Sequence, residues 1–162
     1  MTVKRKILWP AGLIVLLILA AAAIFLIQTG RAQAEENTGS SDAPVVELVY
    51  ANGQVTAREI ADFTAYAAQT DKPVFIDFWA EWCPPCRTAA PFVDSLSEQY
   101  VGTAHIVKIN VDEAQALARQ FGVSSIPLFV VMVDGEVVDQ TIGFSDAMKD
   151  DLKAMIDRQL QH

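Results

Sequence analysis

The chain contains two cysteines, Cys83 and Cys86, with Pro84 and Pro85 between them. The cluster follows a continuous apolar run and precedes a segment with helical periodicity, so we expect Cys83 to lie close to a helix N-terminus. Unpaired N–H groups and the positive end of the helix dipole stabilise a thiolate there, and the thiolate is the nucleophile of thiol chemistry. Two intervening residues bring the second sulfur within reach of a mixed disulfide on the first. The pattern therefore predicts that Cys83 attacks a disulfide and that Cys86 resolves the product.

Three other interpretations explain the cysteine pair less well. A structural disulfide that closes so small a loop contributes only about 2 kcal/mol in the chain-entropy estimate. A zinc site needs about four ligands, and besides the cysteines the chain has only His105, in an expected strand, and His162 at the last position. Two incidental buried thiols leave Trp82 and the two prolines unexplained. We therefore favour redox chemistry, with no metal and no cofactor beyond the Cys83–Cys86 disulfide.

Segments with strand and helix patterns alternate around the cysteines. Thr56 and Glu59 have the spacing of a capping box, which predicts that the first helix opens there. Asp112 with Gln115 is a possible cap for a short helix further on. The expected strands cover residues 45–50, 74–79, 105–111, 128–133 and 136–141, and the expected helices cover about 57–69, 83–100 with a kink at Pro91, 114–121 and a segment from Ser145. This order predicts an α/β fold in which helices flank a central mixed β-sheet with right-handed crossovers.

The first 34 residues contain four basic side chains and no acid. The apolar stretch 7–27, at about 1.5 Å per residue, is long enough to cross the roughly 30 Å hydrocarbon core of a bilayer. Three cations precede this stretch and Arg31 alone follows it, a bias that predicts a cytoplasmic N-terminus. A signal peptide cleaved after Ala34 is the alternative, but its apolar region is usually shorter, so we favour a retained anchor. Both interpretations place the rest of the chain outside the cytoplasm.

Domain organisation follows from this division. We expect a cytoplasmic basic N-terminus, a transmembrane helix, a polar linker and one folded domain, at residues 1–6, 7–30, 31–44 and 45–162. Beyond residue 34 the chain has eight basic side chains against 20 acidic ones. Such a surface repels a phosphate backbone, so we expect no nucleic-acid partner.

The motifs of residues 45–162 resemble those of the thioredoxin family. They are Phe75-Ile-Asp-Phe-Trp-Ala-Glu-Trp-Cys-Pro-Pro-Cys-Arg87, Pro91, Lys108-Ile-Asn-Val-Asp112, Phe121-Gly-Val-Ser-Ser-Ile-Pro127, Asp134-Gly135 and Gly143. The resemblance implies a thioredoxin fold for the domain. Two departures stand out, because Pro84 occupies a position that is usually Gly in cytosolic thioredoxins and Leu128 one that is usually Thr.

The resemblance also implies roles for the catalytic residues. Cys83 is then the exposed attacking thiol and Cys86 the shielded resolving one. Asp77 is the buried acid that exchanges a proton with Cys86, and Lys108 is its electrostatic partner. An acid in an apolar strand should have a raised pKa, which suits proton transfer near neutral pH. The alternatives are an Asp77 that is merely hydrogen-bonded at a strand end and a Lys108 that points to solvent.

A substrate groove is the further implication of the resemblance. Ile126-Pro127 matches the cis-proline position, where the exposed backbone of Ile126 can pair with an extended substrate segment beside Cys83. Trp82 and Gly143 complete the groove, the first by apolar contact and the second by permitting close backbone approach. Pro84 and Pro85 border it, whereas Trp79 is expected in the core.

Taken together, the sequence predicts a thiol–disulfide oxidoreductase in the bacterial inner membrane, with its domain on the periplasmic side. We expect it to reduce disulfides in exported proteins and to be re-reduced by a membrane electron carrier. The same residues could catalyse the reverse reaction in a disulfide-forming oxidase, or act in an isomerase, since redox potential and partners set the direction of electron flow. A binding or assembly module that uses the groove without redox turnover is the alternative from another class.

Overall fold

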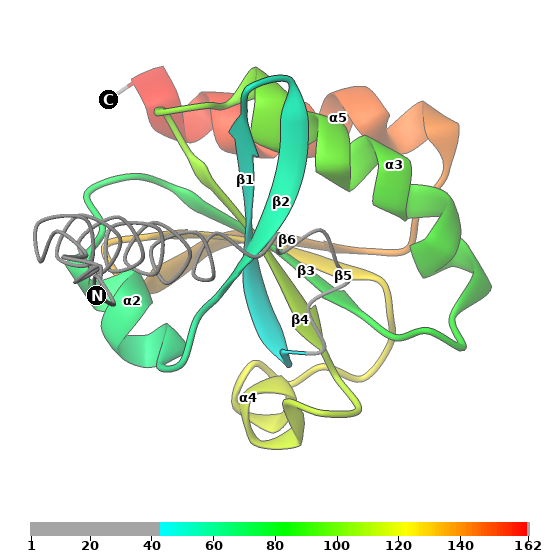
Figure 1. The fold of residues 1–162 in the computed structure, drawn as a ribbon. Coiled ribbons are helices and arrows are strands. Elements are labelled where there is room, and N and C mark those ends of the chain that lie inside the picture. Colours follow the sequence, from blue (N-terminus) through cyan, green and yellow to red (C-terminus); the bar gives the residue numbers. More distant parts are fainter. Residues whose placement is uncertain (1–42, 162) are drawn as a thin grey trace, which may run out of the picture. The chain divides into compact units, whose positions relative to one another are not determined.

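The computed structural model describes residues 43–161, which contain a six-stranded sheet with the order β2-β1-β4-β3-β5-β6 (Figure 1). The strands are β1 (Val45–Ala51), β2 (Gln54–Glu59), β3 (Val74–Trp79), β4 (His105–Asn110), β5 (Leu128–Val133) and β6 (Glu136–Ile142). β3 and β4 pair in parallel, and all other neighbours pair antiparallel. The predicted mixed sheet is thus confirmed.

Helices cover both faces of this sheet (Figure 1). They are α2 (Phe63–Gln69), α3 (Pro84–Gln99), α4 (Gln115–Gln120) and α5 (Lys149–Asp157), with 3₁₀ turns at Asp146–Met148 and Arg158–Gln161. α3 and α5 pack on one face, around Phe75 and Phe129, whereas α2 and α4 pack on the other, around Ile76 and Phe78. Pro91 lies inside α3, where the kink stays a prediction.

The prediction of a helix from Thr56 was wrong. Residues 54–59 form β2, which pairs with β1 through a turn in which Asn52 and Gly53 have φ angles of 54° and 80°. Thr56 faces Val49 across the hairpin, and its hydroxyl donates to the Val49 carbonyl at 3.3 Å. The tight turn favours a hairpin here over the local capping signal. The helix α2 begins instead at Phe63, capped by the Asp62 carboxylate, which accepts the Ala65 N–H at 2.9 Å.

Two other helix starts also differ from the prediction. The Asp112 carboxylate does not cap α4, because Ala114 is its N-cap and makes no side-chain bond. The Asp112 N–H donates to the Asn110 side chain at 3.0 Å, and the Gln115 amide donates to the Asp112 carbonyl at 3.1 Å. After Ser145 the chain first makes a 3₁₀ turn, so α5 begins only at Lys149.

The strand pleat assigns each residue of β3 to one face. Phe75 belongs to the core under α3 and α5, whereas Ile76 and Phe78 belong to the core under α2 and α4. Side chains alternate along a strand, so Asp77 lies on the same face as Phe75, the one that α3 covers. In the parallel pair of β3 and β4, Asp77 stands in register with Lys108.

No helix within residues 43–161 is long and apolar enough to cross a membrane. The expected transmembrane segment 7–30, the basic residues before it and nearly all of the expected linker lie outside the described residues.

Candidate active site

The two cysteines lie where β3 leads into α3. Cys83 is the N-cap residue of α3 and forms a disulfide with Cys86, with a Cα–Cα distance of 5.3 Å. The Cys83 N–H donates to the Ala80 carbonyl at 3.2 Å, which holds the loop after the strand. The predicted position of the pair at a helix N-terminus is therefore confirmed, and the structure describes its oxidised form.

One amide caps the Cys83 sulfur. The side chain of an N-cap residue normally accepts from the N–H of the second or third helical residue. Pro84 and Pro85 occupy the first two helical positions and have no N–H. The Cys86 N–H, at the third position, is directed at the Cys83 Sγ at 3.2 Å. The double proline thus leaves a single short-range backbone donor to stabilise a thiolate on Cys83.

Cys83 is not exposed as the resemblance implied. Cys83 and Cys86 are both only 2% exposed in the disulfide form. They form a small buried cluster with Ala80, against which Trp79 and Ile126 pack. The disulfide bond draws the Cys83 sulfur toward Cys86, and the neighbouring apolar side chains shield the rest of that sulfur from solvent. Pro84 and Pro85 remain exposed beside this cluster.

Asp77 is a buried acid on the face of the sheet that α3 covers. It is 1% exposed, and its Oδ1 atom accepts no hydrogen bond from the described residues. Burial raises the pKa of Asp77 to about 7, even though the Lys108 ammonium lowers it, and Asp94 in α3 raises it further. Asp77 lies in the middle of β3, so the alternative of a satisfied acid at a strand end is wrong.

Lys108 lies on the same face as Asp77 and does not simply point to solvent. It is half-buried, and its Nζ atom lies 4.7 Å from the centroid of the Trp79 ring, a cation–π distance. Trp79 is half-buried against the cysteine cluster. Asp94 was not predicted at this site, although it is the one acid in α3 that follows directly on a buried apolar residue, Val93. Burial raises the pKa of Asp94 too, while Lys108 lowers it.

The segment before β5 completes the site. The Ile126–Pro127 peptide bond is cis, as the resemblance implies. The Pro127 carbonyl accepts the Gly143 N–H at 2.8 Å, and Gly143 has a φ of 88°, which favours glycine. Ile126 packs against the cysteine cluster. Four of the residues predicted from the resemblance, Cys83, Ile126, Pro127 and Gly143, are thereby connected through direct contacts.

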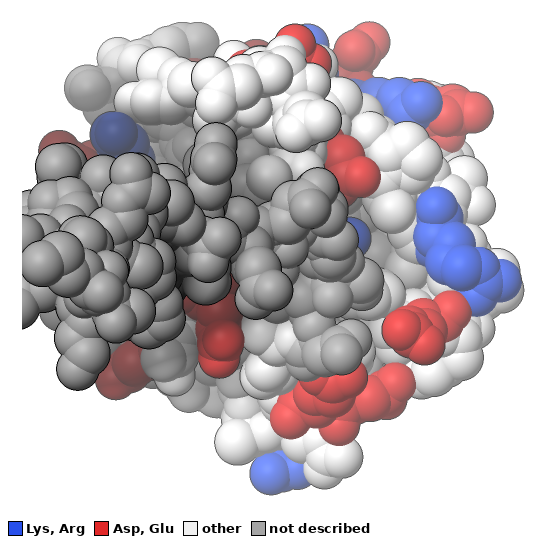
Figure 2. Space-filling model, in the orientation of Figure 1, with Lys and Arg blue, Asp and Glu red and all other residues white. Residues whose placement is uncertain are grey.

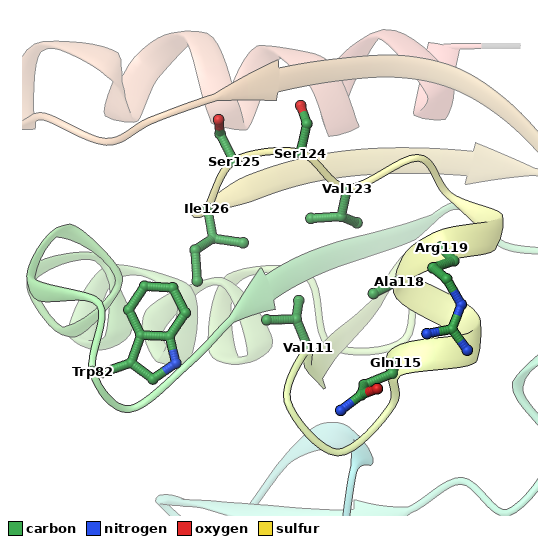
Figure 3. A pocket seen from close by; sticks show the side chains of 9 residues that line it. All are labelled: Trp82, Val111, Gln115, Ala118, Arg119, Val123, Ser124, Ser125 and Ile126. Carbon is green, nitrogen blue, oxygen red and sulfur yellow. The ribbon is translucent and has the colours of Figure 1, made fainter.

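A groove of about 530 Å³ is lined by Trp82, which precedes Cys83 in the chain, and by Ile126, which packs against the cysteine cluster (Figure 3). Trp82 lines it with 64% of its surface exposed, and its indole N–H donates to the Asp112 carboxylate at 2.7 Å. Trp82 and Ile126 were predicted here. The other lining residues were not predicted from the sequence; they are Val111, Gln115, Ala118, Arg119, Val123, Ser124 and Ser125. Three of them could have been grouped from the sequence, because Gln115, Ala118 and Arg119 in α4 have the i, i+3, i+4 spacing of a single helix face.

Within residues 43–161 no three His, Cys, Asp or Glu side chains gather in a way that could hold a metal ion. A disulfide at a helix N-terminus, beside a cis proline and an exposed tryptophan, defines a dithiol–disulfide oxidoreductase.

Comparison with known proteins agrees with this class. A family model described as Thioredoxin matches residues 54–158. The chain is 45% identical to a thioredoxin of Haemophilus influenzae over 83 residues, which are 51% of this chain and 78% of the relative. It is 44% identical to thioredoxin H4 of Arabidopsis thaliana over 90 residues, or 56% and 73% of the two chains. The crystal structure of the reduced Schistosoma mansoni thioredoxin pre-protein matches with a TM-score of 0.54 and 34% identity, covering 61% of this chain and 90% of that one.

The chain therefore belongs to the thioredoxin family. Members of this family are thiol–disulfide oxidoreductases, and they work through an active-site cysteine disulfide in place of a separate cofactor.

Proposed function

We propose that this protein reduces disulfides in exported proteins, with Cys83 as the attacking thiol and Cys86 as the resolving thiol. The observation that carries the proposal is the Cys83–Cys86 disulfide at the start of α3, next to the groove that Trp82 and Ile126 line. N-cap geometry favours the thiolate on Cys83, because the Cys86 N–H is directed at its sulfur.

The first step forms a mixed disulfide. The Cys83 thiolate attacks one sulfur of the substrate disulfide, a bond forms between these two sulfurs, and the substrate S–S bond breaks. The second substrate sulfur leaves as a thiolate and takes up a proton. The substrate segment lies in the groove, where its backbone can pair with Ile126 beside the cis bond.

The second step releases the substrate. Cys86 loses its proton and attacks the Cys83 sulfur, so the Cys83–Cys86 bond forms and the bond to the substrate breaks. The remaining substrate sulfur leaves as a thiolate and takes up a proton. Two electrons have then passed from the protein to the substrate. Asp77 accepts the Cys86 proton, for which a carboxyl with a pKa of about 7 is suited near neutral pH. Before this transfer the Lys108 ammonium, on the same face of the sheet, stabilises the ionised form of Asp77.

The location and the partners belong to the same proposal. We place residues 7–30 in the bacterial inner membrane and the domain on the periplasmic side, on the basis of the apolar length and the flanking charges. An oxidising compartment does not re-reduce the pair, so the reductant is a membrane electron carrier that itself presents a dithiol. The mass of the native protein tests the anchor, because a retained anchor leaves Met1–Ala34 on the purified chain.

Trapping tests the proposed chemistry. In Cys86→Ser the mixed disulfide on Cys83 has no resolving thiol, so exported proteins should accumulate on it and be released by dithiothreitol. Cys83→Ser is the matched control and should trap far fewer. Equal trapping by both variants would overturn the assignment of the two roles.

The redox potential of the Cys83–Cys86 couple tests the direction of electron flow. A reductase requires a low potential, near the −270 mV typical of thioredoxin, whereas a value near −120 mV would indicate a disulfide-forming oxidase. A double Cys→Ser variant tests the binding-module alternative, since such a module keeps its cellular function without either thiol.

A further inference from the structure

The groove differs in charge from the rest of the described domain. Residues 43–161 contain 17 Asp and Glu against eight Lys and Arg. On the face drawn in Figure 2 the basic side chains occur in a few separate places among acidic and uncharged ones. The nine residues that line the groove include no acid and one cation, Arg119. The many carboxylates of the domain repel anions, but none of them lines the groove. An anionic group therefore meets less repulsion in the groove than elsewhere on the domain.

The Arg119 guanidinium is available to a ligand. Arg119 is exposed, and its side chain makes no hydrogen bond or ion pair with any residue that the structure describes, since only its backbone takes part in hydrogen bonds. The other three described arginines are engaged, since Arg58 and Arg158 pair with carboxylates and Arg87 donates to a carbonyl. Arginine presents a planar fork of N–H donors that matches a carboxylate.

The groove has an apolar middle and different ends (Figure 3). Trp82 lies at one end, and Arg119 with Gln115 lies at the other, both projecting from α4. The side chains of Val111 and Ile126 lie between these ends, while the hydroxyls of Ser124 and Ser125 point away from the lining side chains. About 530 Å³ is room for a few side chains of an extended segment and far too little for a folded partner.

A second hollow that shares Trp82 with the groove has the opposite charge. This hollow of about 480 Å³ is lined by Trp82, Asn110 and three acids, Glu81, Asp112 and Glu113. Like charges brought together at an interface disfavour association. An acidic side chain of a bound segment is therefore repelled in the second hollow and attracted by Arg119 in the groove.

We infer that Arg119 is a specificity-determining residue, which pairs with an Asp or Glu of the substrate segment that occupies the groove. This inference rests on the proposed function, because it takes the groove as the place where the segment around the substrate cysteine binds. The preferred segment has its reacting cysteine near Trp82, then apolar side chains over Val111 and Ile126, then a carboxylate at Arg119. Charge complementarity sets the direction in which the segment lies.

The test compares peptides that differ in a single charge. Each peptide has a central cysteine in disulfide linkage to 2-nitro-5-thiobenzoate, apolar neighbours, and one Glu or one Lys placed two to four residues from the cysteine on either side. The release of the yellow thiolate by the reduced full-length protein gives the second-order rate constant for each peptide. For at least one position the Glu peptide should react about threefold to fivefold faster than its Lys counterpart, the range expected of a partly solvated ion pair.

Substitution of Arg119 identifies the cause of that preference. Arg119→Gln should abolish it and Arg119→Glu should reverse it. Lys153→Glu, on α5 at the opposite face of the sheet, changes the net charge as much and should leave the preference intact. A preference that survives in Arg119→Glu, or that is equally lost in Lys153→Glu, would overturn the inference. Circular dichroism and thermal unfolding establish that each variant is folded.

A binding measurement separates this inference from the proposed function. The oxidised protein is titrated with the same peptides carrying Ser in place of the cysteine, so no disulfide exchange is needed. Tighter binding of the Glu peptide that depends on Arg119 supports the inference even if reduction is slow. Equal binding of Glu and Lys peptides at every position overturns it, even if the protein proves to be an efficient reductase.

Discussion

Asp77 and Lys108 stand in register on parallel strands, on the face of the sheet that helix α3 covers. Asp77 is buried, Lys108 is half-buried against Trp79, and Asp94 reaches the same pair from α3. Lys108 thus lowers the pKa of both acids, Asp77 and Asp94, beneath the helix that begins at the cysteines. The desolvation of Asp77 outweighs the attraction of Lys108, so the acid holds its proton up to neutral pH.

Asp77 should make the stability of the domain fall as pH rises. A carboxyl with a higher pKa in the folded than in the unfolded chain binds its proton more tightly when folded, so its stabilising contribution is complete at low pH. That contribution is lost between the ordinary value of 3.8 and the folded value of about 7. Asp77→Asn removes the titration, and above pH 7 it should raise the free energy of unfolding by up to about 4 kcal/mol.

Urea denaturation of oxidised wild type and Asp77→Asn at pH 4, 6 and 8 measures this effect. The two proteins should converge toward pH 4, where Asp77 is neutral. Asp71→Asn, an exposed acid before β3, is the matched control and should follow wild type at each pH. A constant difference between Asp77→Asn and wild type across this range would contradict the assignment of a raised pKa.

Pro85 lacks the N–H that another residue at this position of α3 would direct at the Cys83 sulfur. We therefore expect the pKa of the Cys83 thiol to be higher with Pro85 than with a residue that has this N–H. Pro85→Ala restores the N–H of the second helical residue, which is one of the two amides that can bond an N-cap side chain. The additional donor stabilises the thiolate and should lower the pKa of Cys83 by about one unit, the equivalent of a hydrogen bond worth about 1.4 kcal/mol.

The rate of iodoacetamide alkylation of the reduced protein as a function of pH gives this pKa. Pro84→Ala is the matched control, since the N–H of the first helical residue is not one that caps, and it should shift the pKa much less. A larger shift in Pro84→Ala than in Pro85→Ala would show that the sulfur is oriented differently in the reduced form.

The strand 74–79 and the strand 128–133 were predicted to the residue, because each is an apolar run, interrupted only by Asp77 in the first, that is followed by a polar or turn signal. The segment 54–59 was mistaken for a helix, because a capping box is a local pattern while the pairing of β2 with β1 depends on the turn and on the partner strand.

The site shows the same division between local and long-range information. The position of Cys83 at a helix N-terminus could be predicted from the adjacent residues. Asp94 and Arg119 could not, since their importance arises from Lys108 and Trp82, which lie in distant parts of the chain. The burial of Cys83 depends likewise on Ile126, which only the fold brings to it.

Glu47 should affect stability with a pH dependence opposite to that of Asp77. This buried carboxylate accepts hydrogen bonds from Arg58 and, at 2.7 Å, from His105. Burial raises the pKa of Glu47, but its bonds to His105 and Arg58 outweigh that effect and leave the pKa below the ordinary value of 4.5. Its contribution is therefore present above pH 4.5 and lost as pH falls through the lower folded value. Glu47→Gln should cost about 1–3 kcal/mol at pH 7.

The same urea series tests Glu47, and its difference from wild type should shrink below pH 4.5. Glu59→Gln, an exposed acid at the end of β2, is the matched control and should have little effect at any pH. If Glu47→Gln lowers the free energy of unfolding equally at pH 3 and pH 7, then the packing of the Glu47 side chain, and not its charge, accounts for its contribution to stability.

Tyr100 joins the end of α3 to α5 through one hydrogen bond. Its ring is buried in the core under α3 and α5, and its hydroxyl donates to the Asp157 carboxylate at 2.7 Å. Burial and this bond raise the pKa of Tyr100, so it remains a neutral donor at physiological pH. Tyr100→Phe keeps the packing but loses the bond, and it should lower the free energy of unfolding by about 1–2 kcal/mol. In Asp157→Asn an oxygen acceptor remains, so thermal unfolding should show a smaller loss; the reverse order would mean that the charge of Asp157 matters more than the bond to Tyr100.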